Sequence, residues 1–484
     1  MARCITATTF LVCSLFAGFS GGCASRVPTD EIRAAILSGE VDDLEKRLEE
    51  THEEYSEMVT ALNLARVRQM DGRWADSARA FDEALAILEE YESRALVNIR
   101  ALASGAGTFL LSRGAESYFG AGYERSLLHT FNALNYLMLG DIPGAAAEIR
   151  RMEQRQAFWL EESQARIEKI LENKEKVYDS PEELPQGYSM REILSDEAVR
   201  GLVNNYQDAF SYALGAVLLR LAGDLQAAGV NMRRAMTLDD KAGRFFEQAW
   251  PAAAGGASLK RRDVPPLPGK RPDAVSPAGK RTRKRPDTQE VTIIGFTGLA
   301  PSLGVENVRI WVPVVGHILI DLPAYTQRAV PGSTLLASGP ARKQIALHPL
   351  LRTDLLAYRT LWDSMRAEAG FAVSRAVSRA GIAAGAYLVA KSNSATRDYA
   401  EIIGSLTMLF LDLTAQSMSS SVRNWETLPN TGYLAGTRVP RGAEVTIASG
   451  GSEQRIILPE EAQGIIILAT EMSAANLKVY HVTY

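Results

Sequence analysis

The spacing of hydrophobic residues differs between the two parts of this chain of 484 residues, and that difference limits the folds it can form. From Thr29 to residue 250 they recur every three or four residues, the period of an amphipathic α-helix; after residue 288 several short stretches alternate instead, the period of a β-strand. Between them, 251–287 holds seven prolines and ten Lys or Arg against three Asp, a composition typical of a flexible linker. The sequence therefore predicts a multidomain α+β protein, with a helical domain over 23–250 and an α+β domain over 288–484.

A recurring turn organises the helical part. Gly72, Gly140 and Gly223 each follow an apolar helical stretch, with small and aromatic residues around them at the spacing of a tetratricopeptide (TPR) helix–turn–helix. The first two glycines are 68 residues apart, twice the TPR period of about 34, but the last two are 83 apart. We therefore predict an irregular TPR-like array instead of a regular solenoid.

The C-terminal part combines short strands with two helices. The helices are expected at 353–391 and 395–419, between two groups of strands. The expected strands are Val291–Phe296, Val308–Val315, Ile318–Leu322, Gln344–Leu347, Tyr433–Val439, Glu444–Ala448, Gln454–Leu458, Gly464–Leu468 and Leu477–Val482. This order predicts a sheet or small sandwich that carries a helical hairpin.

All three cysteines lie in the first 23 residues. Arg3, an apolar stretch over 4–19 and the small residues at 20–22 precede Cys23, an arrangement that resembles a bacterial lipoprotein signal. The resemblance implies that residues 1–22 are removed and that Cys23 is acylated, leaving no other cysteine for a disulfide. An ordinary secretory signal cleaved nearby, or an uncleaved membrane anchor, are the alternatives. Ala24 stands where lipoproteins kept in the inner membrane usually have Asp, which implies the periplasmic face of the outer membrane.

Composition and motifs argue against several classes of function. The net charge of −4 offers no overall attraction for nucleic acid, so none is expected as a partner. Gly-x-Ser-x-Gly occurs at 18–22, inside the signal, and the five histidines are scattered without metal-ligand spacing. We therefore expect no enzyme, no metal and no cofactor.

Five polar residues are the candidates for binding a partner. In a TPR register, the first helix of each unit turns Arg66, Gln69, Thr130, Asn132 and Arg220 toward the concave side, where TPR proteins bind peptides or protein elements. The alternative is that they are ordinary surface residues.

Several short motifs together resemble a family of poorly characterised bacterial lipoproteins with TPR-like N-terminal halves. They are Tyr123–Arg125, Ala133–Leu137, Gly140-Asp141, Arg150–Gln156, Gly298–Pro301 and Trp425–Pro429. Members occur near lipoproteins similar to penicillin-binding-protein activators and to curli-secretion lipoproteins. The resemblance implies a lipid-anchored periplasmic scaffold that binds envelope proteins or lipoproteins in envelope assembly or maintenance.

Two other functions stay open from the sequence. One is an envelope enzyme whose site is assembled from distant residues of the C-terminal domain. The other is a glycan-binding or membrane-binding module, which exposed aromatic residues on one sheet face would support. Trp311 and Trp425 are the residues that bear on this second alternative.

Overall fold

A computed structural model describes residues 27–55, 57–101, 120–172, 178–251, 287–312, 316–365, 423–472 and 476–484, with 118, 388, 391 and 392. The predicted signal with Cys23, the linker 252–286 and most of the two predicted C-terminal helices lie outside these residues. Residues 353–365 are helical, as predicted for the start of the first of those helices.

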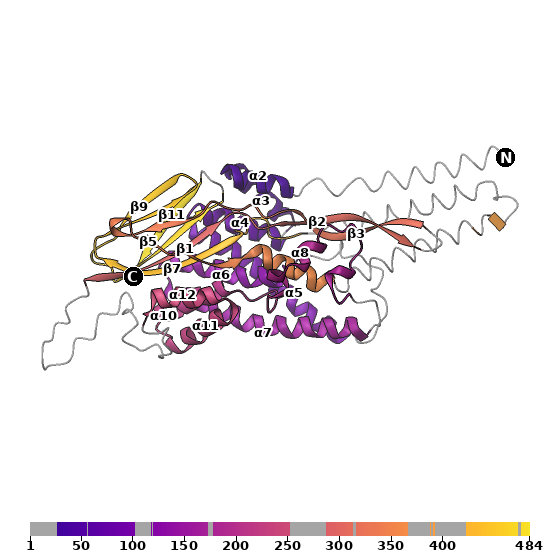
Figure 1. The fold of residues 1–484 in the computed structure, drawn as a ribbon, viewed down its shortest axis with the longest axis horizontal. Coiled ribbons are helices and arrows are strands. Elements are labelled where there is room, and N and C mark those ends of the chain that lie inside the picture. Colours follow the sequence, from indigo (N-terminus) through magenta and orange to yellow (C-terminus); the bar gives the residue numbers. More distant parts are fainter. Residues whose placement is uncertain are drawn as a thin grey trace.

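Helices make up the described chain from Thr29 to Ala249. They are α2 (Thr29–Ser38), α3 (Asp42–Tyr55), α4 (Met58–Met70), α5 (Trp74–Ala101), α6 (Gly122–Met138), α7 (Ile142–Glu172), a 3-10 turn (Pro181–Glu183), α8 (Arg191–Ser195), α9 (Glu197–Arg200), α10 (Ala209–Leu221), α11 (Leu225–Leu238) and α12 (Asp240–Ala249). Figure 1 shows most of them in the middle of the molecule.

The three predicted glycine turns join pairs of packed helices: α4 with α5, α6 with α7, and α10 with α11. Gly72, Gly140 and Gly223 have φ of 75°, 79° and 84°, a left-handed conformation that only glycine adopts without strain. Asp224 then caps α11 by accepting a hydrogen bond from the backbone N–H of Ala227. Each pair is thus reversed by a turn that its sequence specifies.

The strands form three separate sheets. A five-stranded sheet has the order β11 (Leu477–Thr483), β10 (Gly464–Glu471), β1 (Thr288–Thr297), β7 (Thr431–Pro440), β6 (His348–Arg352), and only β1 and β10 are parallel. A four-stranded sheet has the order β5 (Gln344–Ile345), β4 (Leu336–Ser338), β8 (Glu444–Ser449), β9 (Ser452–Ile457). The third is a hairpin of β2 (Ser302–Val312) and β3 (Gly316–Gln327), which extends away from the other sheets in Figure 1.

The five-stranded sheet lies between the helices and the four-stranded sheet. Along β1, Val291 and Ile293 join a hydrophobic cluster with the four-stranded sheet, whereas Ile294 and Phe296 join the cluster of the helices. Strands buried on both faces need apolar side chains at successive positions, which explains the run Ile465–Leu468 in β10. The helical half (residues 29–250) and the C-terminal half (287–484) therefore share one hydrophobic cluster.

Every predicted strand overlaps an observed one, and the described protein is an α+β fold as predicted. Two strands were not predicted. β4 has only three residues, too few to show alternation, and β6 contains Pro349, which the sheet tolerates because β6 lies at its edge.

A buried ion pair joins the two halves at α10 and β1. Arg220 of α10 donates a hydrogen bond to the carboxylate of Glu290, the third residue of β1, and both side chains are less than 10% exposed. The indole Nε1 of Trp250 donates to the same carboxylate at 3.2 Å, and its ring lies 4.6 Å from the Arg220 guanidinium. Such a pair is costly to break because removal of either partner leaves a buried charge.

We predict that Glu290→Gln lowers the free energy of unfolding by about 3–5 kcal/mol, because Arg220 loses its counter-charge. Denaturant unfolding followed by far-UV circular dichroism and tryptophan fluorescence measures the loss. Glu444→Gln is the control: its carboxylate lies 3.9 Å from Arg455 with both side chains well exposed, so the loss should stay below about 1 kcal/mol. Equal losses in both variants would contradict the role given to Glu290.

Candidate functional site

Residues 423–430, here called the Trp425 segment, pack against α4, α5 and α6. The side of the helices that faces this segment is called the inner face below. The Trp425 side chain is fully buried between Phe81 of α5 and Phe131 of α6, with 5.8 Å between its ring centroid and each of theirs. Both contacts are edge-to-face, a favoured geometry for aromatic rings. The segment therefore places a large buried aromatic side chain between two helices of the helical half.

Side chains of two helices bind the backbone of this segment. Glu124 of α6 accepts a hydrogen bond from the backbone N–H of Trp425 at 2.8 Å. Asn63 of α4 accepts from the backbone N–H of Thr427 at 3.2 Å and from its hydroxyl at 3.1 Å. Backbone groups of a buried non-helical segment need partners, and these two side chains supply them.

Glu124 is fully buried and has several hydrogen-bond donors around it. Its carboxylate also accepts from the backbone N–H of Ala121 at 2.6 Å and from the Tyr118 hydroxyl. Burial raises the pKa of Glu124 above its ordinary value, while these hydrogen bonds act in the opposite direction. The carboxylate thus both caps the start of α6 and holds the Trp425 segment.

A second buried carboxylate, Glu426, connects the segment to the N-terminal helix. It accepts from the hydroxyl of Ser302 at 2.8 Å and of Thr29 at 3.3 Å, and lies 3.6 Å from a nitrogen of Arg33. Burial raises the pKa of Glu426 to about 7, although Ser302 and Arg33 both favour its charged form. Glu426 therefore changes charge near neutral pH at a point where α2, β2 and the Trp425 segment meet.

The turn Gly298–Pro301 supports the segment from the other side. The backbone N–H of Ala300 donates a hydrogen bond to the carbonyl oxygen of Leu428 at 2.9 Å. The carbonyl oxygen of Ala300 accepts one from the guanidinium of Arg33 at 2.7 Å. Gly298 has φ of 68°, and a Cβ there would lie 2.2 Å from the carbonyl oxygen of Val330. Only glycine fits this turn, which explains its place at the start of the motif.

The five residues predicted to line an open groove are all buried, with side chains in contact with other parts of the chain; their exposed fractions are 2% or less. The prediction that they line an accessible concave surface is therefore wrong. Gln69, Thr130 and Asn132 are buried against neighbouring helices. Arg220 is buried against Glu290 of the C-terminal half. The first helix of each pair, α4, α6 and α10, is accordingly buried along nearly its whole length.

The structure joins two of these five by a direct hydrogen bond, and Asn135 connects a third, Asn132, to Gln69. Arg66 donates to Gln69, and Gln69 donates to the carbonyl of Phe131 at 2.8 Å. Thr130 and Asn132 instead connect helices to one another, through Ser211 of α10 at 2.8 Å and Asp82 of α5 at 3.4 Å. Arg220, the fifth, pairs with Glu290 as described above.

Arg66 is a buried cation that no carboxylate of the described residues pairs with. Its guanidinium lies 4.1 Å from the ring centroid of Phe131, and among the described residues Nε and Nη2 have no hydrogen-bond partner. Burial alone lowers the pKa of Arg66 to about 9. The ring of Phe131 and the hydrogen bond to Gln69 are the contacts that offset the burial of this charge.

Sequence reasoning missed Asn63, Glu124 and Glu426 as binding residues and left Trp425 as a candidate for an exposed surface. The sequence feature that could have indicated these residues was the set of motifs that carry the family resemblance. Three of those motifs, Tyr123–Arg125, Gly298–Pro301 and Trp425–Pro429, are far apart in sequence and meet at this site. Trp311, the other tryptophan singled out, is 64% exposed.

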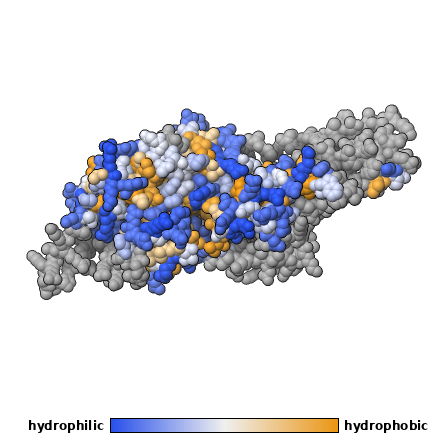
Figure 2. Space-filling model, viewed as in Figure 1, coloured by the Kyte–Doolittle hydropathy of each residue, from blue (hydrophilic) through white to orange (hydrophobic). Residues whose placement is uncertain are grey.

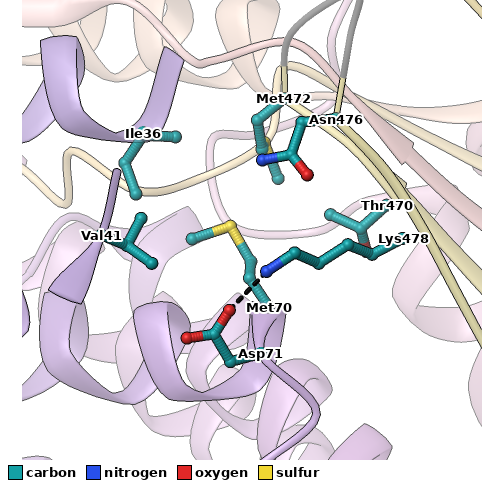
Figure 3. Close-up of a pocket in the computed structure, with 8 residues that line it drawn as sticks. All are labelled: Ile36, Val41, Met70, Asp71, Thr470, Met472, Asn476 and Lys478. Carbon is teal, nitrogen blue, oxygen red and sulfur yellow. Dashed lines mark hydrogen bonds and ion pairs between the residues drawn. The ribbon is translucent and has the colours of Figure 1, made fainter. Parts of the chain in front are cut away.

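Two hollows among the described residues lie away from the Trp425 segment. Figure 3 shows one between the helical half and β11, where Lys478 donates to Asp71 and Met70 faces Met472. Its volume of about 20 Å³ is room for about one water molecule. A wider hollow of about 740 Å³ lies open on the surface along residues 182–195. Neither includes Glu124 or Glu426.

Comparisons with protein-family models, with curated proteins and with solved structures find no match for this chain. Within the part of the chain that the structure describes, no helix is both long and apolar enough to cross a bilayer. The His, Cys, Asp and Glu side chains of that part form no group of three or more that could hold a metal ion.

We predict that Trp425→Ala lowers the free energy of unfolding by about 3–5 kcal/mol, because the helices cannot close the cavity left between Phe81 and Phe131. Trp311→Ala is the matched control, since the same change at an exposed position should cost less than about 0.5 kcal/mol. Chemical denaturation measures both variants. A Trp425→Ala protein as stable as the control would show that the segment is not anchored by its indole.

We also predict that stability depends on pH through Glu426. Its pKa in the folded protein, about 7, exceeds the ordinary value of 4.5, so the folded state binds this proton more tightly than the unfolded state. The resulting stabilisation is complete below about pH 4.5 and is lost as pH rises through about 7, by on the order of 3 kcal/mol.

Glu426→Gln is the variant that tests this, because it keeps the neutral form at every pH. The difference in unfolding free energy between variant and wild type should change across pH 4.5–7 in the variant's favour as pH rises. Taking the difference removes the contribution of Asp208, whose pKa burial raises to about 6. A difference that stays constant across this range would contradict the prediction.

Proposed function

We propose that this protein is a lipid-anchored periplasmic scaffold of the bacterial envelope, with a TPR-like helical array that holds its own Trp425 segment. The observation that carries the proposal is the chemistry of the inner face. Glu124 and Asn63 bind backbone groups, and Phe81 and Phe131 enclose an indole. These are contacts of polypeptide recognition, and each is made to a segment of the same chain.

The TPR-like reading rests on the three helix pairs and their left-handed glycine turns. TPR arrays bind extended segments on the concave side, and here an intramolecular segment takes that place. We therefore assign contacts with envelope proteins or lipoproteins to the outer surfaces of the molecule. The Pro-rich basic residues 251–287 would then serve as a linker between halves that pack against each other.

The anchor is proposed at Cys23, four residues before the first described residue, Val27. Four residues reach roughly 14 Å when extended. Helix α2 follows directly. It is attached to the rest of the protein through Arg33, whose guanidinium donates hydrogen bonds to the backbone carbonyls of Ala300 and Arg328. A lipid at Cys23 would therefore hold the whole molecule close to a bilayer, on the periplasmic face of the outer membrane.

An envelope enzyme is the second candidate, and one observation favours it: Glu426 has a pKa of about 7, the value expected of a general acid or base. Its carboxylate is 4% exposed: Oε1 accepts from Ser302 and Thr29, and Oε2 lies 3.6 Å from Arg33. We favour the scaffold because these neighbours use Glu426 to join three parts of the chain. Loss of a hydrolytic activity in Glu426→Gln, with the fold intact, would reverse this preference.

We predict that mass spectrometry of the protein purified from bacterial membranes finds an acylated Cys23 at the N-terminus. Cys23→Ala should abolish the acyl mass and the outer-membrane location, whereas Cys13→Ala should change neither, because residue 13 is removed with the signal. Cross-linking in intact cells followed by purification should recover envelope proteins with the Cys13→Ala protein. An unmodified Cys23 in a cytosolic protein, or no envelope protein recovered while the purified protein cleaves cell-wall or lipid substrates, would overturn the proposal.

A further inference from the structure

The β2–β3 hairpin has one buried face and one exposed face. Strand pairing places Arg309 opposite Leu319 and Trp311 opposite His317, and all four side chains are exposed. At the alternate positions, Val308, Ile318 and Ile320 are buried and Ile310 is half-buried. The hairpin thus presents a second face that no described part of the molecule covers, at the end of strands that extend from the body (Figure 1).

That exposed face carries large apolar side chains. Trp311 is 64% and Leu319 58% exposed, and as diagonal neighbours on paired strands they form one continuous patch. The other tryptophans of the sequence, at 74, 159, 250, 362 and 425, are all described and are buried or half-buried. Trp311 is therefore the exception in a protein that otherwise places its indoles inside.

The sequence of the hairpin end is apolar as well. From Trp311 to Leu319 it contains no Asp, Glu, Lys or Arg, although hairpin connections are ordinarily polar. Arg309 lies next to this stretch on the exposed face. On the side shown in Figure 2, hydrophobic and charged residues lie beside one another over the hairpin region.

The width of the hairpin argues against a protein as the occupant of this face. Two strands about 5 Å apart and about 33 Å long offer a face of a few hundred Å², whereas a stable protein interface buries about 800 Å² on each partner. A bilayer surface sets no such minimum. Tryptophan prefers the interfacial region of a bilayer, and an adjacent Arg can reach headgroup phosphates.

The base of the hairpin lies at the start of the described chain. Gln327 of β3 donates to Asp30 of α2, and Ser302 of β2 shares Glu426 with Thr29. A tether from Cys23 to Val27 of roughly 14 Å is shorter than the hairpin, at about 33 Å. An anchored molecule therefore brings the hairpin to the bilayer at a shallow angle, not upright.

We propose that the exposed face of the β2–β3 hairpin, through Trp311, Leu319 and Arg309, is a second contact with the lipid bilayer, inserted at the level of the headgroups. The position of the membrane relative to the hairpin rests on the lipid anchor proposed above. The contact itself rests on the exposed apolar pair and is independent of that anchor. Together the two contacts would fix the orientation of the protein on the membrane.

The test is quenching of tryptophan fluorescence by brominated lipid. The full chain, purified from membranes, is reconstituted in vesicles of phosphatidylethanolamine and phosphatidylglycerol, with and without brominated acyl chains. We expect quenching in the wild type and its loss in Trp311→Phe. Trp74→Phe is the matched control: Trp74 is half-buried against Tyr480, so this variant should keep the quenching.

The acyl mass of Cys23, measured on the same samples, separates the two proposals. Quenching that depends on Trp311 in a protein without acyl chains would support the hairpin contact and overturn the anchor. An acylated protein that stays with the vesicles but shows no Trp311-dependent quenching would overturn the hairpin contact and leave the anchor standing. Cross-linking of residue 311 to a second copy without quenching would likewise overturn it, in favour of self-association.

Discussion

Burial of the Trp425 segment against α4, α5 and α6 is the contact on which the rest of the structure depends. Helices α4, α6 and α10 are buried along nearly their whole length, and α4 and α6 bury polar side chains such as Asn63 and Glu124 among the apolar ones. Their inner side therefore needs both apolar contacts and hydrogen-bond partners. Hydrophobic burial supplies the driving force, but it is not directional. The hydrogen bonds from Trp425 to Glu124 and from Thr427 to Asn63 fix the position of this segment along the helices.

Buried charged side chains also join the helical half to the C-terminal half. Arg220 with Glu290 joins α10 to β1, and Arg33 near Glu426 joins α2 to the Trp425 segment. Removing a charge from water is costly, so these groups are satisfied only when the two halves meet in one way. Because the pKa of Glu426 is about 7, the charge at this part of the junction changes near neutral pH.

Because the Trp425 segment covers the inner face, contacts with other molecules must be made by the outer surfaces. The N-terminal helix and the base of the β2–β3 hairpin lie together, so a lipid at the N-terminus and an apolar hairpin face would act on the same side of the protein. A protein held at two points by a bilayer presents its remaining surfaces in a defined direction. That property suits a scaffold, whose partners must find it in a constant orientation.

The order of elements could be predicted from the sequence because it depends on local properties. Periodicity distinguishes helix from strand, and Gly72, Gly140 and Gly223 end helices because the required φ excludes other residues. The binding site could not be predicted in this way. Arg66 and Gln69 look like surface residues on a helix taken alone, and Glu124 and Glu426 are ordinary acidic residues in sequence. Only the tertiary structure decided that they are buried, because burial depends on which distant segment packs against them, and contacts across 300 residues leave no periodic trace in a single sequence.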